Sequence, residues 1–256
     1  MSSFLDDFCD NESAFPSMSS AQSEAMSTDF IGKMTRRPVC FSCKRPQKVC
    51  LCDVFPEQLI DSTITCIILQ HPFECKRKKR TDWIAQRIVG RTLIFQGRSV
   101  KAADSEILRR ALSDPKSCAL IFPFDSQTLT ESTDTHSPIK TLFFLDGTWQ
   151  QAREMFKASP ELQEISRFKL ALPNNYKGAF LIRKAVAELK EGSEFCPLST
   201  AEAVALAVDE ICNSSERTIA TRKVLKAFCD KQLSFTKADS IKHRTERAGY
   251  IENFYL

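Results

Sequence analysis

Glycine is scarce in this chain, with seven occurrences in 256 residues. None of the seven belongs to a Gly-x-Gly-x-x-Gly fingerprint, a Gly-Lys-Ser/Thr loop or a Gly-x-Ser-x-Gly turn. Those motifs serve dinucleotide-binding Rossmann folds, P-loop NTPases and α/β-hydrolases. Their absence argues against all three classes of enzyme.

Long hydrophobic runs are also missing. No apolar stretch approaches the roughly 20 residues of a membrane span, and the N-terminus does not pair a basic region with an apolar one, as a secretory signal would. We therefore expect no membrane association. Eleven cysteines without such a signal favour an intracellular reducing compartment over a disulfide framework. Nucleus and cytoplasm both remain open.

Positive charge is absent from the first thirty residues, which hold six acidic side chains and no Lys or Arg. Since the whole chain carries a net charge of +4, the rest carries +10. A basic body suits a polyanionic partner such as nucleic acid, although a solvated surface can have the same charge. Residues 1–36 are rich in Ser, Asp, Glu and Met without a sustained period, and we expect them to form a disordered tail.

Four cysteines lie within thirteen residues, in the segment 37–56. They form a Cys-x2-Cys pair and a Cys-x-Cys pair separated by turn-forming residues, and they are Cys40, Cys43, Cys50 and Cys52. Two such pairs can surround one tetrahedral Zn²⁺ ion, and four protein ligands are typical of a structural site. The other seven cysteines lack this spacing and are expected to behave as small apolar residues.

From residue 60 onward, short apolar runs alternate with helical patterns, which predicts an α/β domain with a mainly parallel sheet. Strands are expected at 63–70, 91–95, 118–122, 141–145 and 167–172. Helices are expected near 83–89 and at 103–112, 149–158, 203–212 and 219–232. The polar segment 125–138 predicts a mobile loop.

The most informative of these strands, 141–145, has no polar alternation, as in a strand buried on both faces. It ends in the turn Asp146-Gly147, and Thr148 can cap the helix that follows. Asp146 therefore lies at the carboxyl end of a buried strand, where ligands bind in open α/β sheets. Taken alone, however, the stretch favours the simpler interpretation of a turn Asp followed by a core Trp at Trp149.

Two further stretches contain polar residues next to the predicted end of a strand or start of a helix. His71-Pro72-Phe73-Glu74 comes directly after the first strand and precedes the basic run 76–80. That run suits either phosphate binding at the sheet edge or a nuclear localisation signal. Farther on, Ser199 and Glu202 have the spacing of a helix capping box, which requires no function.

Together these stretches resemble the DTW-domain family of tRNA-uridine aminocarboxypropyltransferases. The resemblance is carried, in order, by the cysteine segment, by His71-Pro72-x-Glu74, by Asp146-x-Thr148-Trp149, and by Ile182-Arg183-Lys184 with Leu198-Ser199-Thr200-x-Glu202-Ala203. The chain departs from the family where a Thr-Gly-Arg-like turn is expected, since Thr81-Asp82-Trp83 stands there.

The resemblance implies a SPOUT-like α/β fold with a C-terminal trefoil knot, here over residues 60–256. It also implies that S-adenosylmethionine donates a 3-amino-3-carboxypropyl group to N3 of a uridine in tRNA, giving acp3U and methylthioadenosine. It favours a monomer but leaves the oligomeric state open. A SPOUT-type RNA methyltransferase and a non-catalytic, zinc-containing RNA-binding module remain as alternatives.

The residues implied by the resemblance fall into three groups. The catalytic group, with Asp146 as the base, is Asp146, Thr148 and Trp149; Trp149 either stacks on the substrate or only packs. The donor-binding group is Leu198, Ser199, Thr200 and Glu202, where Glu202 either holds the donor's ammonium or caps the helix. The tRNA-binding group is His71, Glu74, Lys76, Arg77, Lys79, Arg80, Arg183 and Lys184.

Overall fold

A computed structural model describes residues 38–77, 79–122, 127–129, 139–173, 176–180 and 198–234. Its centre is a six-stranded sheet in the order β2-β1-β5-β3-β6-β4. Every strand pair is parallel. The strands are β1 (Thr65–Gln70), β2 (Thr92–Gln96), β3 (Cys118–Ile121), β4 (Gln127–Thr128), β5 (Thr141–Asp146) and β6 (Ser166–Lys169). The predicted α/β class and parallel sheet are confirmed.

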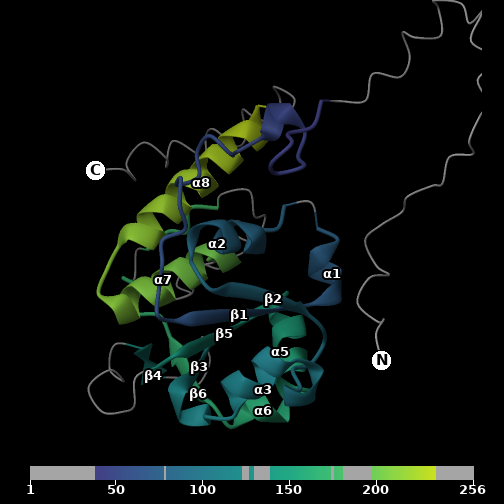
Figure 1. Cartoon of the computed structure of the whole chain (residues 1–256), viewed down its shortest axis with the longest axis vertical. Helices are drawn as coiled ribbons and strands as arrows, with labels where there is room; N and C mark the ends of the chain where they lie inside the picture. The colour runs from purple at the N-terminus through teal and green to yellow at the C-terminus, as the bar shows by residue number, and fades with distance from the viewer. Residues whose placement is uncertain are drawn as a thin grey trace, which may run out of the picture.

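Helices cover both faces of this sheet (Figure 1). On one face lie α2 (Asp82–Ile88), α7 (Thr200–Cys212) and α8 (Glu216–Leu233), and on the other lie α3 (Glu106–Leu112), α5 (Trp149–Lys157) and α6 (Pro160–Gln163). A short helix, α1 (Pro72–Cys75), follows β1. The 3-10 turns are η2 (Gln47–Val49), η3 (Ala102–Asp104) and η4 (Pro115–Ser117). None of the described helices is long and apolar enough to cross a membrane.

Two hydrophobic cores explain why the central strands lack alternation. Along β1, Cys66 and Ile68 pack toward α2, α7 and α8, whereas Ile67 and Leu69 pack toward α3 and α5. A strand covered on both faces buries every side chain, and it therefore appears in the sequence as a continuous apolar run. The expected burial of β5 on both faces is confirmed by Leu142 and Phe143, which belong to opposite cores.

Some boundaries differ from the prediction. The helix predicted at 103–112 is split at Ser105, which caps α3 through its hydroxyl oxygen. The short helix α6 was not predicted; Pro160 occupies a first-turn position there, where proline is tolerated. Within the predicted loop 125–138, Gln127–Thr128 forms the edge strand β4.

Several expectations lie outside the described residues. They are the disordered tail at 1–36, most of the loop 125–138, and the side chains of Arg183 and Lys184. The knot also stays a prediction, because it depends on how the chain passes from Phe180 to Leu198, and residues 181–197 are not described. The division into a zinc segment and a catalytic domain likewise remains a prediction.

Candidate active site and cysteine cluster

Register places two polar residues side by side at the carboxyl edge of the sheet. Gln70, the last residue of β1, pairs with Asp146, the last residue of β5. The amide of Gln70 donates from Nε2 to Asp146 Oδ2 at 2.9 Å, and the His71 N–H donates to the Asp146 carbonyl at 2.8 Å. The last residue of β5 is therefore fixed both to the last residue of β1 and to the residue that follows β1.

Asp146 is held from a second side by α7. The hydroxyl of Thr200, the first residue of that helix, donates to Asp146 Oδ1 at 2.5 Å. Both carboxylate oxygens thus accept a hydrogen bond, and the residue is 6% exposed. Each carboxylate oxygen has a second lone pair. The two hydrogen bonds therefore orient the carboxylate, and it can still accept a further hydrogen bond or a proton.

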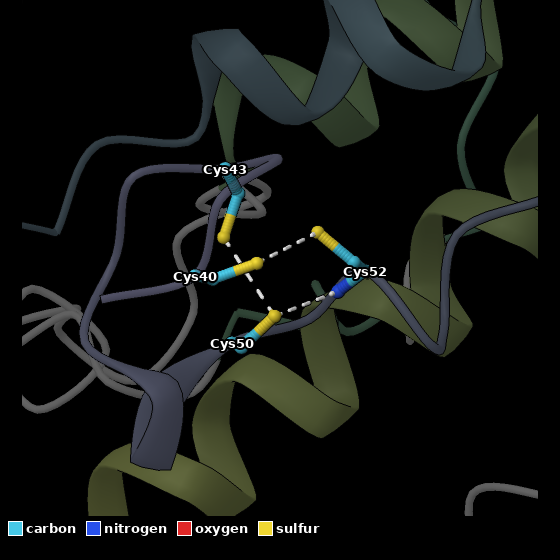
Figure 2. A group of neighbouring side chains, drawn as sticks. All are labelled: Cys40, Cys43, Cys50 and Cys52. Atoms are coloured by element: carbon cyan, nitrogen blue, oxygen red, sulfur yellow. Dashed lines mark hydrogen bonds between the residues drawn. The ribbon is translucent and has the colours of Figure 1, made fainter. Parts of the chain in front are cut away.

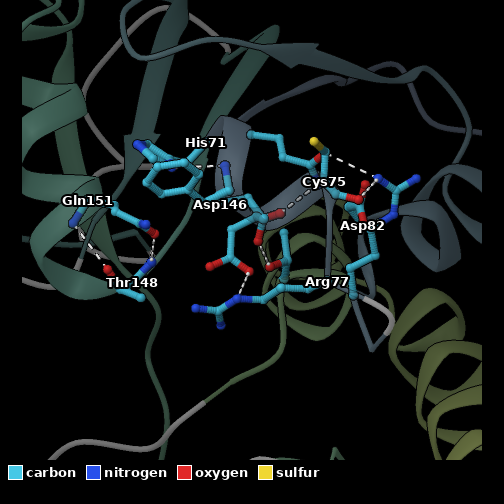
Figure 3. A network of polar contacts seen from close by, with 12 residues as sticks. His71, Cys75, Arg77, Asp82, Asp146, Thr148 and Gln151 are labelled. Carbon is cyan, nitrogen blue, oxygen red and sulfur yellow. Dashed lines mark hydrogen bonds and ion pairs between the residues drawn. The ribbon is translucent and has the colours of Figure 1, made fainter. Parts of the chain in front are cut away.

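Gln70 is in turn connected to Arg80 and Asp82, and Figure 3 shows the polar network that contains Asp146, Cys75 and Asp82. Arg80 donates from Nη1 to Gln70 Oε1 at 3.4 Å and to the carbonyl of Cys75 at 3.3 Å. Its Nε lies 3.5 Å from Oδ1 of the fully buried Asp82. Burial raises the pKa of the Asp82 carboxyl, an effect that the Arg80 guanidinium opposes. Because Arg80 occupies the oxygen of the Gln70 amide, the NH₂ group of that amide must face Asp146.

The turn after β5 leads into a capped helix. Thr148 Oγ1 accepts from the Gln151 N–H at 3.3 Å, and Gln151 Oε1 accepts from the Thr148 N–H at 2.8 Å. This capping box confirms the expected N-terminus of α5. A Cβ on Gly147 would come within 3.1 Å of the Gln151 Cβ and 3.6 Å of the His71 Cβ. Glycine therefore leaves room for Gln151 to fold back onto the turn in the capping box.

Trp149 does not belong to the core. Its side chain is 42% exposed, whereas Ala152 and Met155, which share its helical pattern, are buried. The structure therefore contradicts a core Trp at this position, and the ring lies at the surface next to the Asp146 turn.

The residues implied to bind tRNA divide by exposure. Lys76, Arg77 and Lys79 are exposed. Glu74 is buried and pairs with Arg77 Nε at 3.2 Å, so it supports that guanidinium. Arg80 is partly buried and turned toward Gln70 and Asp82, as described above.

His71, which the resemblance places in the tRNA-binding group, is buried at the start of α1. Its Nδ1 accepts from the Phe73 N–H at 3.2 Å and caps α1, and the residue is 5% exposed. Burial, assisted by the Arg98 guanidinium, lowers the pKa of His71. The hydrogen bond that Nδ1 accepts and the lowered pKa both favour the neutral imidazole.

The start of α7 differs from the predicted capping box. Ser199 Oγ accepts from the Glu202 N–H at 3.2 Å, as expected. The Glu202 carboxylate, however, accepts from the Ala179 N–H at 2.8 Å, from Tyr176 Oη at 2.8 Å and from Arg222 Nη1 at 2.7 Å. It is fully buried. Its sequence spacing suggested a local role, whereas it joins α7 to α8 and to the chain before residue 181.

Sulfur atoms of the four clustered cysteines all lie within 4.8 Å of one another (Figure 2). A tetrahedral ion with Zn–S bonds of about 2.3 Å requires sulfur–sulfur distances of about 3.8 Å. The Cys40–Cys52 and Cys43–Cys50 sulfur pairs are 3.8 Å and 3.7 Å apart. The four residues therefore fit the expected zinc ion.

Two arginines lie against this cysteine cluster. Arg87 Nη1 is 3.6 Å from Cys52 Sγ and lowers the pKa of that thiol to about 6. Arg45 places its guanidinium 4.6 Å from the centre of the Phe228 ring and 5.1 Å from that of Trp83. Four thiolates around Zn²⁺ carry a net charge of −2, which two guanidinium groups can offset. They also connect the cluster to α2 and α8.

Comparison with known proteins decides the family. The model of the DTW domain matches residues 37–233. The chain belongs to the DTW-domain family. It is 29% identical to tRNA-uridine aminocarboxypropyltransferase A of Arabidopsis thaliana over 220 residues, covering 77% of this chain and 83% of that protein. No solved structure matches the chain.

Two animal relatives carry the name tRNA-uridine aminocarboxypropyltransferase 2. The protein of Drosophila melanogaster is 35% identical over 138 residues, covering 53% of this chain and 55% of that protein. The protein of Mus musculus is 30% identical over 204 residues, covering 77% of this chain and 64% of that protein. The chain thus spans little more than half the length of the first of these relatives.

Proposed function

We propose that this protein transfers the 3-amino-3-carboxypropyl group of S-adenosylmethionine to N3 of a uridine in tRNA, giving acp3U. The names of the relatives support a uridine of tRNA as the substrate. The observation that carries the chemistry is the position of Asp146, a carboxylate oriented by Gln70 and Thr200 at the carboxyl edge of the sheet. The SPOUT-like knotted fold is part of the same proposal.

Asp146 acts as the general base in this proposal. Uridine N3 carries a proton and is a weak nucleophile until that proton leaves. The carboxylate accepts the proton while N3 forms a bond to the donor carbon next to the sulfonium. The bond between that carbon and sulfur breaks, and its electron pair stays on sulfur, so methylthioadenosine leaves as a neutral thioether. General-base catalysis of this kind contributes roughly 10²- to 10⁴-fold.

The side chains around Asp146 have distinct proposed roles. Trp149, three residues after Asp146 and half-exposed, offers a face on which the uridine ring or the adenine of the donor can stack. Thr148 fixes the start of α5 and thereby the position of Trp149. The partly exposed Leu198 and Thr200 contact the donor, whereas the buried Ser199 and Glu202 hold the α7 terminus in place.

Basic side chains on the same edge hold the tRNA backbone. Lys76, Arg77 and Lys79 are exposed next to α1, and contacts of Lys and Arg with phosphates position a nucleic acid without reading its sequence. We propose that Arg183 and Lys184 contribute to the same surface. The cysteine cluster holds a structural Zn²⁺ ion outside this reaction, since all four coordination positions are supplied by protein.

The test uses purified protein, tRNA and a donor labelled in its amino-acid arm. Asp146→Asn preserves the size of the side chain but removes the base, and we expect transfer to fall by about 10²- to 10⁴-fold. Asp114→Asn is the matched control, because Asp114 lies before β3 at the opposite edge of the sheet. Mass spectrometry of the nucleosides identifies the product. Unchanged transfer by Asp146→Asn would remove Asp146 from catalysis, and a methyl group on the uridine would identify a methyltransferase.

A further inference from the structure

An exposed aromatic side chain lies at the sheet edge beside the proposed active site. Phe73 is the second residue of α1, three positions after the end of β1, and its side chain is 55% exposed. An aromatic ring exposed to this degree contributes little to folding. Neither the DTW motif nor the proposed mechanism uses it.

The ring of Phe73 is held in a defined position. The His71 imidazole packs against it at a centroid distance of 5.2 Å with an interplanar angle of 64°. The Phe73 N–H donates to His71 Nδ1, and His71 is in turn bound to the Asp146 carbonyl through its own N–H. The ring is therefore linked through a single residue to the strand end that carries the proposed base.

A positive charge accompanies the ring. Arg98, which follows β2, places its guanidinium 5.6 Å from the centre of the Phe73 ring, and its side chain is exposed. The strands β2, β1 and β5 are neighbours in that order. Shortly after their ends follow Arg98, Phe73 and the turn from Asp146 to Trp149. Cation, ring and carboxylate form a row along one edge of the sheet.

The chemistry of this row selects its ligand. An exposed ring beside a guanidinium offers a face for stacking and a charge for a phosphate, which is the combination that binds unpaired nucleotides. An apolar protein segment would gain from the ring but would have to bury Arg98 and approach the exposed Lys76 and Arg77. The positive surroundings therefore favour a polyanion over an apolar partner.

We propose that Phe73 and Arg98 form a nucleotide-binding site for the residue next to the modified uridine, with its base stacked on Phe73 and its phosphate at Arg98. This proposal rests on the proposed function, because it takes the reacting uridine to lie at Asp146. The proposal requires the nucleotide next to the modified uridine to be unpaired, since a base within a duplex cannot stack on a side chain.

The experiment measures binding of the full chain to tRNA and to a short single-stranded oligonucleotide with 2-aminopurine beside a uridine. We expect Phe73→Ala to weaken binding by about 5- to 20-fold and to abolish the change in 2-aminopurine fluorescence. Phe73→Trp should restore both, because it restores an aromatic face. Arg98→Gln should weaken binding and lower the salt dependence by about one phosphate contact.

Phe41→Ala is the matched control. Phe41 is 90% exposed and also lies near a cation, with Lys44 Nζ 4.6 Å from its ring centre, but it belongs to the cysteine segment. Equal losses in Phe41→Ala and Phe73→Ala, or no loss in Phe73→Ala, would overturn the proposed site. If the unmodified protein binds the oligonucleotide through Phe73 but forms no acp3U, the proposed function fails and the nucleotide site stands.

Discussion

Thr200 and Asp146, 54 residues apart in the chain, share a hydrogen bond of 2.5 Å from the hydroxyl to the carboxylate. Thr200 begins α7 and Asp146 ends β5. The proposed base is therefore oriented by a helix that is far away in sequence. Movement of the α7 terminus would change the direction in which the carboxylate faces.

Thr200→Val should lower the turnover of the transfer reaction without weakening tRNA binding. The substitution preserves the shape of the side chain but removes its donor to Asp146 Oδ1, so the carboxylate keeps only the hydrogen bond from Gln70. We expect kcat to fall about tenfold, in keeping with the loss of one orienting hydrogen bond of about 1–1.5 kcal/mol. Thr200→Ser, which retains the hydroxyl, should behave as the unmodified protein. A Thr200→Val enzyme with normal kcat would show that this bond does not position the base.

Arg80 and Lys79 are adjacent in the chain but should affect different kinetic constants. Arg80→Lys preserves a positive charge near Asp82 but loses the planar group that donates to Gln70 Oε1. If Arg80 positions Gln70, turnover falls about tenfold while the tRNA dissociation constant stays within about twofold. Lys79→Ala should do the reverse, weakening tRNA binding and lowering its salt slope by about one. Full turnover in Arg80→Lys would show that Arg80 does not position Gln70 and would favour its original assignment as a phosphate contact.

The positions of Asp146 and of the four cysteines were predictable because each depends on local sequence. A polar residue at the end of a buried strand must lie at the carboxyl edge of a parallel sheet, and the paired Cys spacing determines one cluster. The same reasoning applies to Gln70, the polar residue that ends β1. Its pairing with Asp146 follows once the two strands are neighbours.

Other roles were not predictable, because they depend on contacts between distant segments. Glu202 has the spacing of a capping residue, but Tyr176, the Ala179 N–H and Arg222 surround its carboxylate. Arg80 lies within a basic run, but in the fold its guanidinium contacts Gln70, the Cys75 carbonyl and Asp82. Hydrophobic periodicity and secondary-structure propensity describe residues that are close in sequence. These roles depend instead on which distant segments pack together in the fold.

Zinc should be a stoichiometric component of the purified protein, at about one ion per chain. Cys50→Ser removes one of the four sulfur ligands and should lose most of the metal and lower the melting temperature, since binding of a structural ion contributes to folding. Cys212→Ser, a cysteine outside the cluster, should retain it. Elemental analysis of the three proteins decides the point, and an unmodified protein without zinc would disprove the metal site.

The pH dependence of folding should report on the buried carboxyl of Glu202. Burial raises the pKa of this group above its ordinary value of 4.5 despite its hydrogen bonds and Arg222. The folded chain therefore holds this proton more tightly than the unfolded chain does. As a result, the contribution of Glu202 to the free energy of unfolding declines as the pH rises from about 4.5 toward the folded-state pKa.

Glu202→Gln removes that titration and leaves an amide whose oxygen still accepts from the Ala179 N–H and from Tyr176. We expect the decline in stability above pH 4.5 to become shallower in this variant than in the unmodified protein. Urea unfolding between pH 4 and 7 measures the slope, with Glu210→Gln on the same helix as the control. If the unmodified protein and Glu202→Gln lose stability equally over this range, another group carries the pH dependence. A steeper decline in the variant would mean that attraction to Arg222 outweighs the cost of burying the Glu202 charge.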